Sequence, residues 1–251
     1  MLNIEQKDFF TRMVGGKMTS DIKKKDHPKS IEPLYDKKLT CLYCEKNFTS
    51  KQVRTSRIKL LGQDSDYCPH YEGENPIFYE AFICPHCGFT FTQSFNELTP
   101  GRREIIEKNY IRKLKEIPNY CGHRTWKEAI RAFNLAALSS YLKGENEAIT
   151  GHLFLRIAWI YRYVNEKEKE ERFLKKALEF YHEAYLKGGS NTTNISEYQL
   201  LYLMGDIYTR LDHYQEASKI FSQLFSDPDV PPKIRSRAID TWNQYKENQQ
   251  K

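Results

Sequence analysis

Four cysteines offer the clearest chemistry in this chain. Cys41 and Cys44 form the pair CLYC, Cys84 and Cys87 form the pair CPHC, and 39 residues separate the two pairs. Two such pairs, brought together by a fold, supply the four thiolates of a tetrahedral Zn²⁺ site with Zn–S distances of about 2.3 Å. Four thiolates close the coordination shell, so the expected role is structural. Iron is the alternative metal, because tetrahedral sulfur ligation suits it as well.

The segment between the pairs holds a second group of reactive side chains. The candidates for an accessory metal or polar site are Asp64, Asp66, Cys68 and His70. Carboxylate pairs can perform acid–base work in a cleft, but more often they bond backbone N–H groups in turns. A lone cysteine is commonly a small buried hydrophobe. Cys121 and His123 form a C-x-H pair that is open to the same two interpretations.

The positive charge of the chain is concentrated in one segment. The net charge is +6, and residues 99–131 hold 9 Lys+Arg against 4 Asp+Glu, an excess of +5. Such a stretch can meet phosphates or acidic protein surfaces, although a solvated helix face is the more ordinary explanation. The candidate anion-binding residues are Arg102, Arg103, Arg112, Lys113, Lys115 and Arg124.

Both cysteine pairs lie between segments with strand character. KKLT and NFTSKQV flank the first pair. After the second pair, Phe89, Phe91 and Phe95 alternate with hydroxyl residues, which is the period of a strand with one buried face. Gly88 follows the second pair and suits a positive φ, whereas Glu45 takes the same place after the first pair, where more strain is expected. A module of about 60 residues has a marginal core, which a structural metal can stabilise.

From about residue 100 onward the pattern is helical. Apolar residues recur at helical spacing over 124–143, 147–164 and 167–187, and a final helix is expected over 232–248. Ser196 and Gln199 offer a capping box for the helix that starts there.

One helical segment resembles a tetratricopeptide repeat. In 198–231, Gly205, Tyr208, Ala217 and Phe221 occupy the small and large positions of that 34-residue pattern. The small residues let two antiparallel helices approach closely, and the rings fill the space between them. We therefore expect one well-formed repeat and several degenerate ones.

These patterns predict an α+β chain, with a small zinc-bound β module (zinc-ribbon- or rubredoxin-like) followed by an all-α tetratricopeptide-like repeat domain. The predicted divisions are a flexible leader (1–36), the zinc-binding β module (37–98), a basic helical linker (99–123) and the tetratricopeptide-like domain (124–251). The start has no apolar signal segment, and no run reaches the roughly 18 apolar residues of a membrane span. The expected location is cytoplasmic, with no membrane partner.

The order of these features resembles a known bacterial family. YDKKLTCLYCEKNF, then DSDYCPHYEGENPIFYEAFICPHCGF, then tetratricopeptide-like helices is similar to the uncharacterised domain-of-unknown-function family 2225, over roughly residues 31–240. The resemblance implies a zinc-ribbon-like module joined to a helical repeat, and it brings no assigned activity. Leu42 and Glu45 depart from the Pro and Gly more usual in such knuckles, which concerns the knuckle geometry and leaves the ligands intact.

Three classes of function are weighed on these grounds. The leading hypothesis is a non-enzymatic, zinc-stabilised adaptor that binds a protein or peptide partner through its helical repeat. The alternative is a nucleic-acid-binding protein that uses the basic helix 102–131 beside the zinc module, although four thiolates on one Zn²⁺ add a charge of about −2 there. An enzyme is not expected, because no P-loop, dinucleotide fingerprint, HExxH or GxSxG motif is present.

Overall fold

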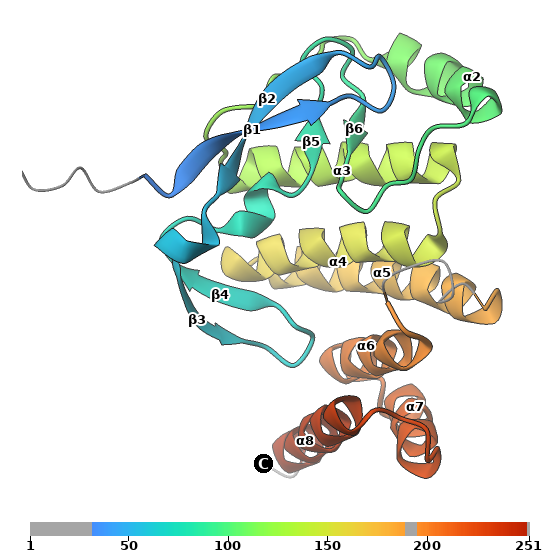
Figure 1. Cartoon of the computed structure of the whole chain (residues 1–251). Coiled ribbons are helices and arrows are strands. Elements are labelled where there is room, and N and C mark those ends of the chain that lie inside the picture. The colour runs from blue at the N-terminus through green and yellow to red at the C-terminus, as the bar shows by residue number, and fades with distance from the viewer. Residues whose placement is uncertain (1–31, 189–194, 250–251) are drawn as a thin grey trace, which may run out of the picture. The chain divides into compact units, whose positions relative to one another are not determined.

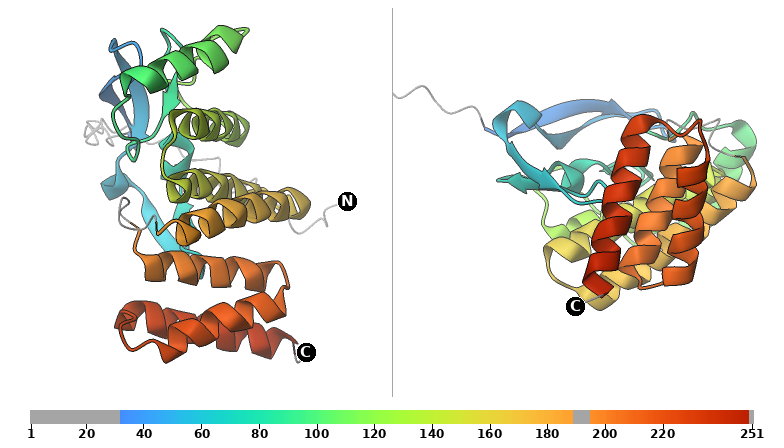
Figure 2. Two further views of the ribbon diagram at one scale, coloured as in Figure 1. Left: turned by 90° about the vertical axis from the view of Figure 1, so that its right-hand side faces the viewer. Right: turned by 90° about the horizontal axis from the view of Figure 1, so that it is seen from below.

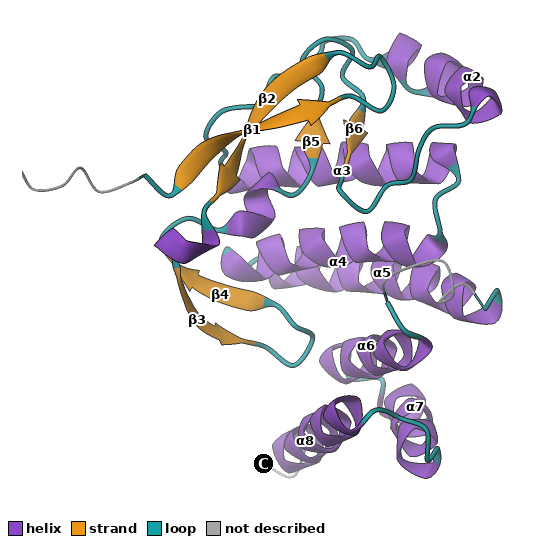
Figure 3. Ribbon diagram, in the orientation of Figure 1, coloured by secondary structure: helices purple, strands orange, loops and turns teal. Residues whose placement is uncertain are grey.

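The computed structural model describes residues 32–188 and 195–249. In these ranges it combines three two-stranded antiparallel sheets with a series of helices (Figure 1, Figure 3). The α+β class is therefore confirmed. Most of the predicted leader, residues 1–31, lies outside the described residues, and the first strand begins at Leu34, inside the leader's predicted range.

The first hairpin carries the first cysteine pair. β1 (Leu34–Thr40) and β2 (Asn47–Val53) pair antiparallel, with Thr40 opposite Asn47 at the closed end. Cys41 and Cys44 therefore lie in the connecting turn. The strands predicted on both sides of this pair are confirmed.

A second hairpin repeats this arrangement on a smaller scale around Cys84 and Cys87. It consists of β5 (Phe82–Ile83) and β6 (Thr90–Phe91). The prediction of a strand with one buried face is wrong here, because Thr90 is as fully buried as Phe89. The Thr90 hydroxyl lies 2.9 Å from the hydroxyl of Tyr110, so hydrogen bonding allows its polar face to be covered.

A third hairpin lies between the two cysteine pairs in the sequence. β3 (Lys59–Gln63) and β4 (Pro69–Glu72) pair antiparallel with a register shift between Leu60 and Gly62. Short 3₁₀ helices, η1 (Thr55–Arg57) and η2 (Pro76–Tyr79), precede and follow it. Its turn, residues 64–68, is called the docking turn below.

The remaining elements are helical. They are α2 (Pro100–Asn109), η3 (Ile111–Lys113), α3 (Trp126–Lys143), α4 (Glu147–Tyr163), α5 (Lys167–Leu186), α6 (Glu197–Arg210), α7 (Tyr214–Ser226) and α8 (Pro232–Gln249). The four helices predicted from apolar spacing are confirmed, as is the capping box of Ser196 and Gln199. None of the helices in the described ranges has the length and apolar character needed to cross a bilayer.

Successive long helices pack against one another in chain order (Figure 2). Glycine permits close approaches at two of these contacts. A Cβ on Gly205 of α6 would lie 3.1 Å from atoms of both Ile220 and Phe221 of α7. A Cβ on Gly151 of α4 would lie 2.7 Å from the ring of Tyr181. The close approach predicted at Gly205 is therefore confirmed.

One buried hydrophobic cluster runs from the cysteine hairpins into the helices. It joins Phe82 and Phe89 to Phe133 of α3, Trp159 of α4 and Ile207 of α6. A smaller cluster lies between α6, α7 and α8. Packing is thus continuous across the predicted module boundaries, and the residues from 32 onward form one compact unit.

Candidate metal centre

The structure brings the four predicted ligands together. All of their Sγ atoms lie within 4.8 Å of one another, and the Cys41–Cys87 and Cys44–Cys84 pairs are each 3.6 Å apart. A tetrahedral shell with metal–sulfur distances of about 2.3 Å places its sulfurs about 3.8 Å apart. The donor set and its spacing therefore fit one tetrahedral metal ion, which these four thiolates would hold.

Both cysteine pairs sit in backbone knuckles of the same form. The amides of Glu45 and Gly88 donate to the carbonyls of Cys41 and Cys84, at 3.0 and 2.8 Å. The φ angle is +61° at Glu45 and +76° at Gly88. Glycine adopts this left-handed conformation readily, whereas a residue with a Cβ is strained there. The strain expected in the first knuckle is therefore located at Glu45.

The thiols of the cluster do not ionise independently. A hydrogen bond from the Cys87 thiol lowers the pKa of Cys41 to about 6. Burial raises the pKa of Cys84 to about 11, and the hydrogen bond to Cys41 together with burial raises the pKa of Cys87. A bound metal ion would therefore have to displace protons from Cys84 and Cys87.

Helix α2 and the segment after it support both knuckles. Arg103 donates to the carboxylate of Glu45 at 2.7 Å and to the carbonyl of Tyr43. Tyr110 is 1% exposed, and its hydroxyl lies 3.0 Å from the carbonyl of Gly88, to which it donates. Part of the predicted basic linker is thus built into the support of the metal centre.

The second predicted cluster assembles around the docking turn. One donor atom each of Asp64, Cys68 and His70 lies within 4.8 Å of the others. The His70 Nε2 atom is 2.8 Å from Asp64, and the Cys68 thiol donates to the Tyr163 hydroxyl at 3.3 Å. Burial raises the pKa of Cys68 to about 12, so the thiol stays protonated and is a poor ligand and nucleophile.

Side chains from the helices neutralise the negative charge of the carboxylates in this cluster and donate hydrogen bonds to them. Arg162 of α4 donates to Asp64 at 2.8 Å and to Asp66 at 2.7 Å, and the Trp159 indole donates to Asp66 at 2.8 Å. Arg210 of α6 is a further donor to Asp66, at 3.4 Å. Asp66 is 0% exposed. The charge that a cation would have to match is already matched, which favours the structural interpretation of these residues over an accessory metal site.

Two further contacts complete the hold on the docking turn. Arg237 of α8 donates to the carbonyls of Ser65 and Asp64 at 3.1 and 2.8 Å, and its guanidinium lies 4.1 Å from the ring centre of Tyr67. Tyr202 of α6 donates to the Ser65 carbonyl at 2.7 Å. The turn is therefore bound by three helices at once.

Arg124 is a correction to the predicted anion-binding set. It is 2% exposed, and its guanidinium donates to the carbonyls of Phe78, Ala81 and Tyr120 at 3.1, 2.6 and 2.6 Å. A guanidinium enclosed by main-chain acceptors is not available to a phosphate. Arg124 instead fastens the segment before β5 to the start of α3.

The other members of that set lie at or near the surface. Arg103 and Arg112 pair with Glu45 and Glu107 at 2.7 and 3.0 Å. The exposed members are Arg102, Arg112, Lys113 and Lys115. Ion pairing at two of the arginines lowers the positive charge that this surface offers.

Cys121 and His123 have separate partners. The Cys121 thiol contacts the carbonyl of Ile83 at 3.6 Å, and the His123 Nε2 atom is 3.1 Å from Glu74. These contacts favour the structural interpretation of the C-x-H pair.

The arginines that hold the docking turn carry no motif in the sequence. Arg162, Arg210 and Arg237 lie on helices that apolar spacing predicts, and that spacing carries no information about the partners of a charged residue. The available signal was a mismatch, since the acidic segment 64–80 contains no Lys or Arg of its own.

A comparison with known protein families places this chain in one of them. A family model described as an uncharacterized protein conserved in bacteria, DUF2225, matches residues 34–245. The chain belongs to this family. The DUF2225 match spans both cysteine pairs, the docking turn and the helices from α2 to α7. No curated protein and no solved structure matches the chain.

Proposed function

We propose that this DUF2225 protein is a non-enzymatic, zinc-stabilised adaptor that binds a protein or peptide partner through its helices. The observation that carries the proposal is the closed shell of four cysteines, all within 4.8 Å of one another. A tetrahedral ion with four sulfur ligands keeps no open position for water or substrate. The metal then serves to hold the zinc-ribbon-like hairpins in place, and recognition belongs to other surfaces.

The helices support a tetratricopeptide-like role. Proteins of that kind stack helical hairpins so that each unit contacts its neighbours and a long surface results. Here α6 and α7 approach closely at Gly205, and the helices before and after them pack in chain order.

We place the partner surface at one end of the helical stack. The carboxyl-terminal turns of α3 and α5 form this surface. Leu138 and Tyr141 of α3 are 44% and 67% exposed, and Leu186 at the end of α5 is 81% exposed. An ion pair of 2.5 Å between Lys187 and Glu147 ties the end of α5 to the start of α4. Contiguous exposed apolar patches commonly mark interaction sites, and we propose that these three residues contribute to one. The face that α4, α6 and α8 turn toward the docking turn is already occupied by the chain's own residues.

Affinity purification from native cells at modest salt tests this proposal. The full chain is compared with a variant that carries Leu138→Glu, Tyr141→Glu and Leu186→Glu. A matched control carries Leu60→Glu and Leu61→Glu on β3, where the two leucines are 56% and 59% exposed. The expected result is a protein partner that the wild type and the control retain and the α3/α5 variant loses. If the wild type recovers no protein above background, the adaptor proposal fails.

The metal is tested separately by elemental analysis of the purified protein. One zinc per chain in a colourless protein is expected. If the purified protein is coloured and contains iron, iron is the metal of this site and not zinc.

Nucleic-acid binding has weaker support. The buried Arg124 and the ion-paired Arg103 and Arg112 leave Arg102, Lys113 and Lys115 as the main candidates of the original set. If the purification recovers a nucleic acid instead, with affinity that falls steeply as salt rises, this alternative takes the place of the adaptor.

A further inference from the structure

A cavity of about 680 Å³ lies between the hairpins and α4, apart from the metal cluster. Its size is in the range of small-molecule sites, about 300–1,000 Å³. Its apolar wall includes Phe82, Phe95, Phe133 and Leu153, and its polar wall includes Gln52, Ser94 and Asn96. A second cavity of about 370 Å³, with Tyr67, Tyr71 and Trp159 in its wall, adjoins it.

An ion pair stands in the wall of both cavities. Glu80 and Arg156 line each of them, and the Arg156 Nε donates to Glu80 at 2.8 Å. The Arg156 guanidinium also lies 4.3 Å from the ring centre of Trp159, within the range of a cation–π contact. Glu80 is 36% exposed and Arg156 is 17% exposed, so each side chain keeps some accessible surface beside the ion pair.

Two polar atoms of this wall lack partners. Arg156 Nη1 and Gln52 Oε1 are buried and make no hydrogen bond with any residue in the described ranges. A buried polar atom without a partner destabilises the fold, and a hydrogen-bonding partner relieves that cost. One of the two is a donor and the other an acceptor, and both have almost no accessible surface. A ligand that satisfied both would carry an acceptor and a donor, and the two side chains would have to turn toward the cavity to meet it.

The charges of the wall are balanced. Arg156 supplies one positive charge and Glu80 one negative charge. The third titratable group that lines both cavities, His152, has its Nδ1 atom 3.2 Å from the Tyr181 hydroxyl. Burial and the charge of Arg156 lower the pKa of His152 well below its ordinary value, so it adds no charge near neutral pH. A zwitterionic ligand, with one positive and one negative group, therefore fits this wall better than an anion or a cation does.

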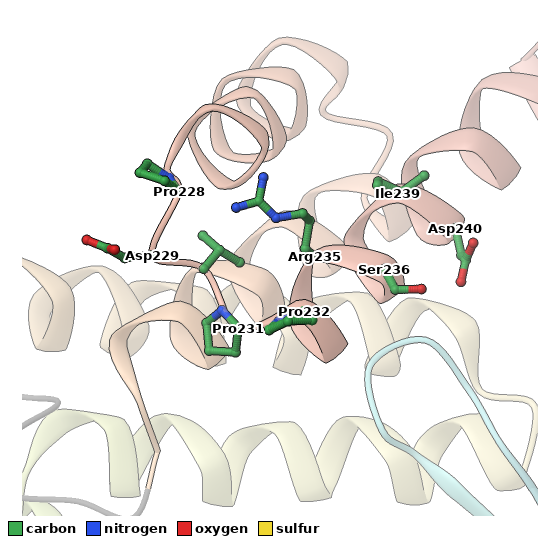
Figure 4. A pocket seen from close by; sticks show the side chains of 9 residues that line it. Pro228, Asp229, Pro231, Pro232, Arg235, Ser236, Ile239 and Asp240 are labelled. Carbon is green, nitrogen blue, oxygen red and sulfur yellow. The ribbon is translucent and has the colours of Figure 1, made fainter.

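The hollow formed by the loop before α8 and the first turns of α8 lacks such an ion pair (Figure 4). It measures about 530 Å³ and contains one arginine, Arg235. That guanidinium donates to the carbonyls of Phe225 and Asp227 at 3.0 and 2.6 Å, so it is committed to the end of α7.

We propose that the larger cavity binds a zwitterionic α-amino acid with an apolar side chain. Its carboxylate would accept hydrogen bonds from the Arg156 guanidinium, and its ammonium would donate to Glu80 and Gln52. The apolar side chain would lie against the rings of Phe82, Phe95 and Phe133. This site is independent of the proposed adaptor surface on α3 and α5.

Calorimetric titration of the full chain with its metal bound tests the ligand class. The probes are L-phenylalanine and L-leucine. The expected result is a Kd below about 1 mM for at least one of them. The matched probes are N-acetyl-L-phenylalanine, which lacks the ammonium, and L-phenylalaninamide, which lacks the carboxylate; with L-leucine as ligand the same two derivatives of leucine are used. Each is expected to bind at least tenfold more weakly, and equal binding of the blocked forms, or no binding of either amino acid, overturns the proposal.

Two variants then assign the contacts. In Glu80→Gln the preference for the free over the N-acetylated amino acid is expected to fall at least about threefold, because only the Gln52 contact to the ammonium remains. In Arg156→Gln the free acid and the amide are expected to bind alike. This pairing of variant with probe distinguishes a lost contact from a damaged fold. The control, Arg112→Gln, removes an exposed arginine that also pairs with one carboxylate, and it should bind as the wild type does. Variants that keep the full discrimination between the probes would refute the assignment.

Discussion

Asp66 connects the docking turn to the helices at the scale of single side chains. It accepts hydrogen bonds from Trp159 and Arg162 at 2.7–2.9 Å and has no exposed surface. A buried charge pair is expensive to break, because the remaining partner keeps a charge that neither water nor protein compensates. Because of these contacts, the Asp66 carboxylate joins the docking turn to the helices and is not free to act as an acid or a base.

We predict that Asp66→Asn lowers the free energy of unfolding by about 3–5 kcal/mol, measured by urea denaturation. The matched control is Asp36→Asn, since Asp36 is 61% exposed and pairs with Lys51 at 3.0 Å. Exposed pairs of this kind contribute about 0–1 kcal/mol. Equal effects of the two substitutions would contradict the docking role of Asp66.

A pH dependence follows from the same carboxylate. Burial alone would raise the pKa of Asp66, but the hydrogen bond from Arg162 and the charges of Arg210 and Arg162 outweigh it and lower the pKa below 3.8. A lowered pKa in the folded state means that the stabilisation is present above the unfolded value, about 3.9, and is lost as the pH falls through the folded value.

The measured quantity is the difference in the free energy of unfolding between the wild type and Asp66→Asn. It is followed from about pH 2 to about pH 7, which includes the range in which carboxylates titrate. Effects of acid on the metal centre are common to both proteins and cancel in this difference. The difference should be constant above about pH 5 and shrink below about pH 4. A difference that grows on acidification would have the wrong sign. Neighbouring Asp206 has a raised pKa, mainly from burial and in part from the charge of Asp66, so its own contribution has the opposite sign and differs between the two proteins. The comparison is therefore made between two proteins that both also carry Asp206→Asn.

The two knuckles show how one element is built from different residues. Each requires a positive φ after its second cysteine, supplied by Glu45 in one and Gly88 in the other. The position after Cys87 is also closed in space, because a Cβ on Gly88 would lie 2.5 Å from Leu114 Cδ1. Glu45, by contrast, is exposed, so its only cost is backbone strain.

Exchanging these residues should have opposite effects. Gly88→Ala is expected to lower the free energy of unfolding by at least about 1–2 kcal/mol, the cost of a left-handed residue with a Cβ, with the contact to Leu114 in addition. Glu45→Gly is expected to raise it by up to about 1 kcal/mol. Glu45→Gln keeps the Cβ and controls for the ion pair with Arg103, so it should show no gain. Denaturant titration at saturating zinc measures all three, and a stabilised Gly88→Ala would disprove this account of the knuckle.

The whole molecule is held by a core that does not stop at the cysteine hairpins. Phe82 and Phe89 belong to the same buried cluster as Phe133 and Trp159, and the docking turn binds α4, α6 and α8. Cooperative unfolding depends on such shared burial, because a part that loses its neighbours loses much of its own stabilisation.

Removal of the metal is therefore expected to destabilise the helices as well as the hairpins. With a chelator present, thermal unfolding should shift to lower temperature in one transition, with circular dichroism of the helices and near-ultraviolet signals of the tyrosines changing together. The control is the same chelator after re-addition of excess zinc, which should restore the original curve. Two separate transitions, with the helices unchanged, would instead support the predicted division into modules 37–98 and 124–251.

Local patterns in the chain were sufficient for much of the architecture. The spacing of apolar residues placed α3, α4, α5 and α8, and the cysteine pairs identified the ligands now found within 4.8 Å of one another. These features depend on neighbours a few residues away, which is the range over which helix periodicity, caps and knuckles are encoded. The alternation after Cys87 misled for the same reason, since it says nothing of the side chains that cover Thr90 from other elements.

The chain by itself thus determined its helices from α3 onward, its hairpins around the cysteines and the four-sulfur donor set. The expectation of a basic helix over 102–131 is wrong, because α2 ends at Asn109 and the next α-helix, α3, begins at Trp126. Only the tertiary structure decided the roles of the charged residues. It buried Arg124 among main-chain carbonyls, set Arg162 and Arg210 against Asp66, and placed Glu80 and Arg156 in the wall of one cavity. The physical reason is that a charge acts through whatever lies within a few ångströms of it, and for these residues those partners are distant in the sequence.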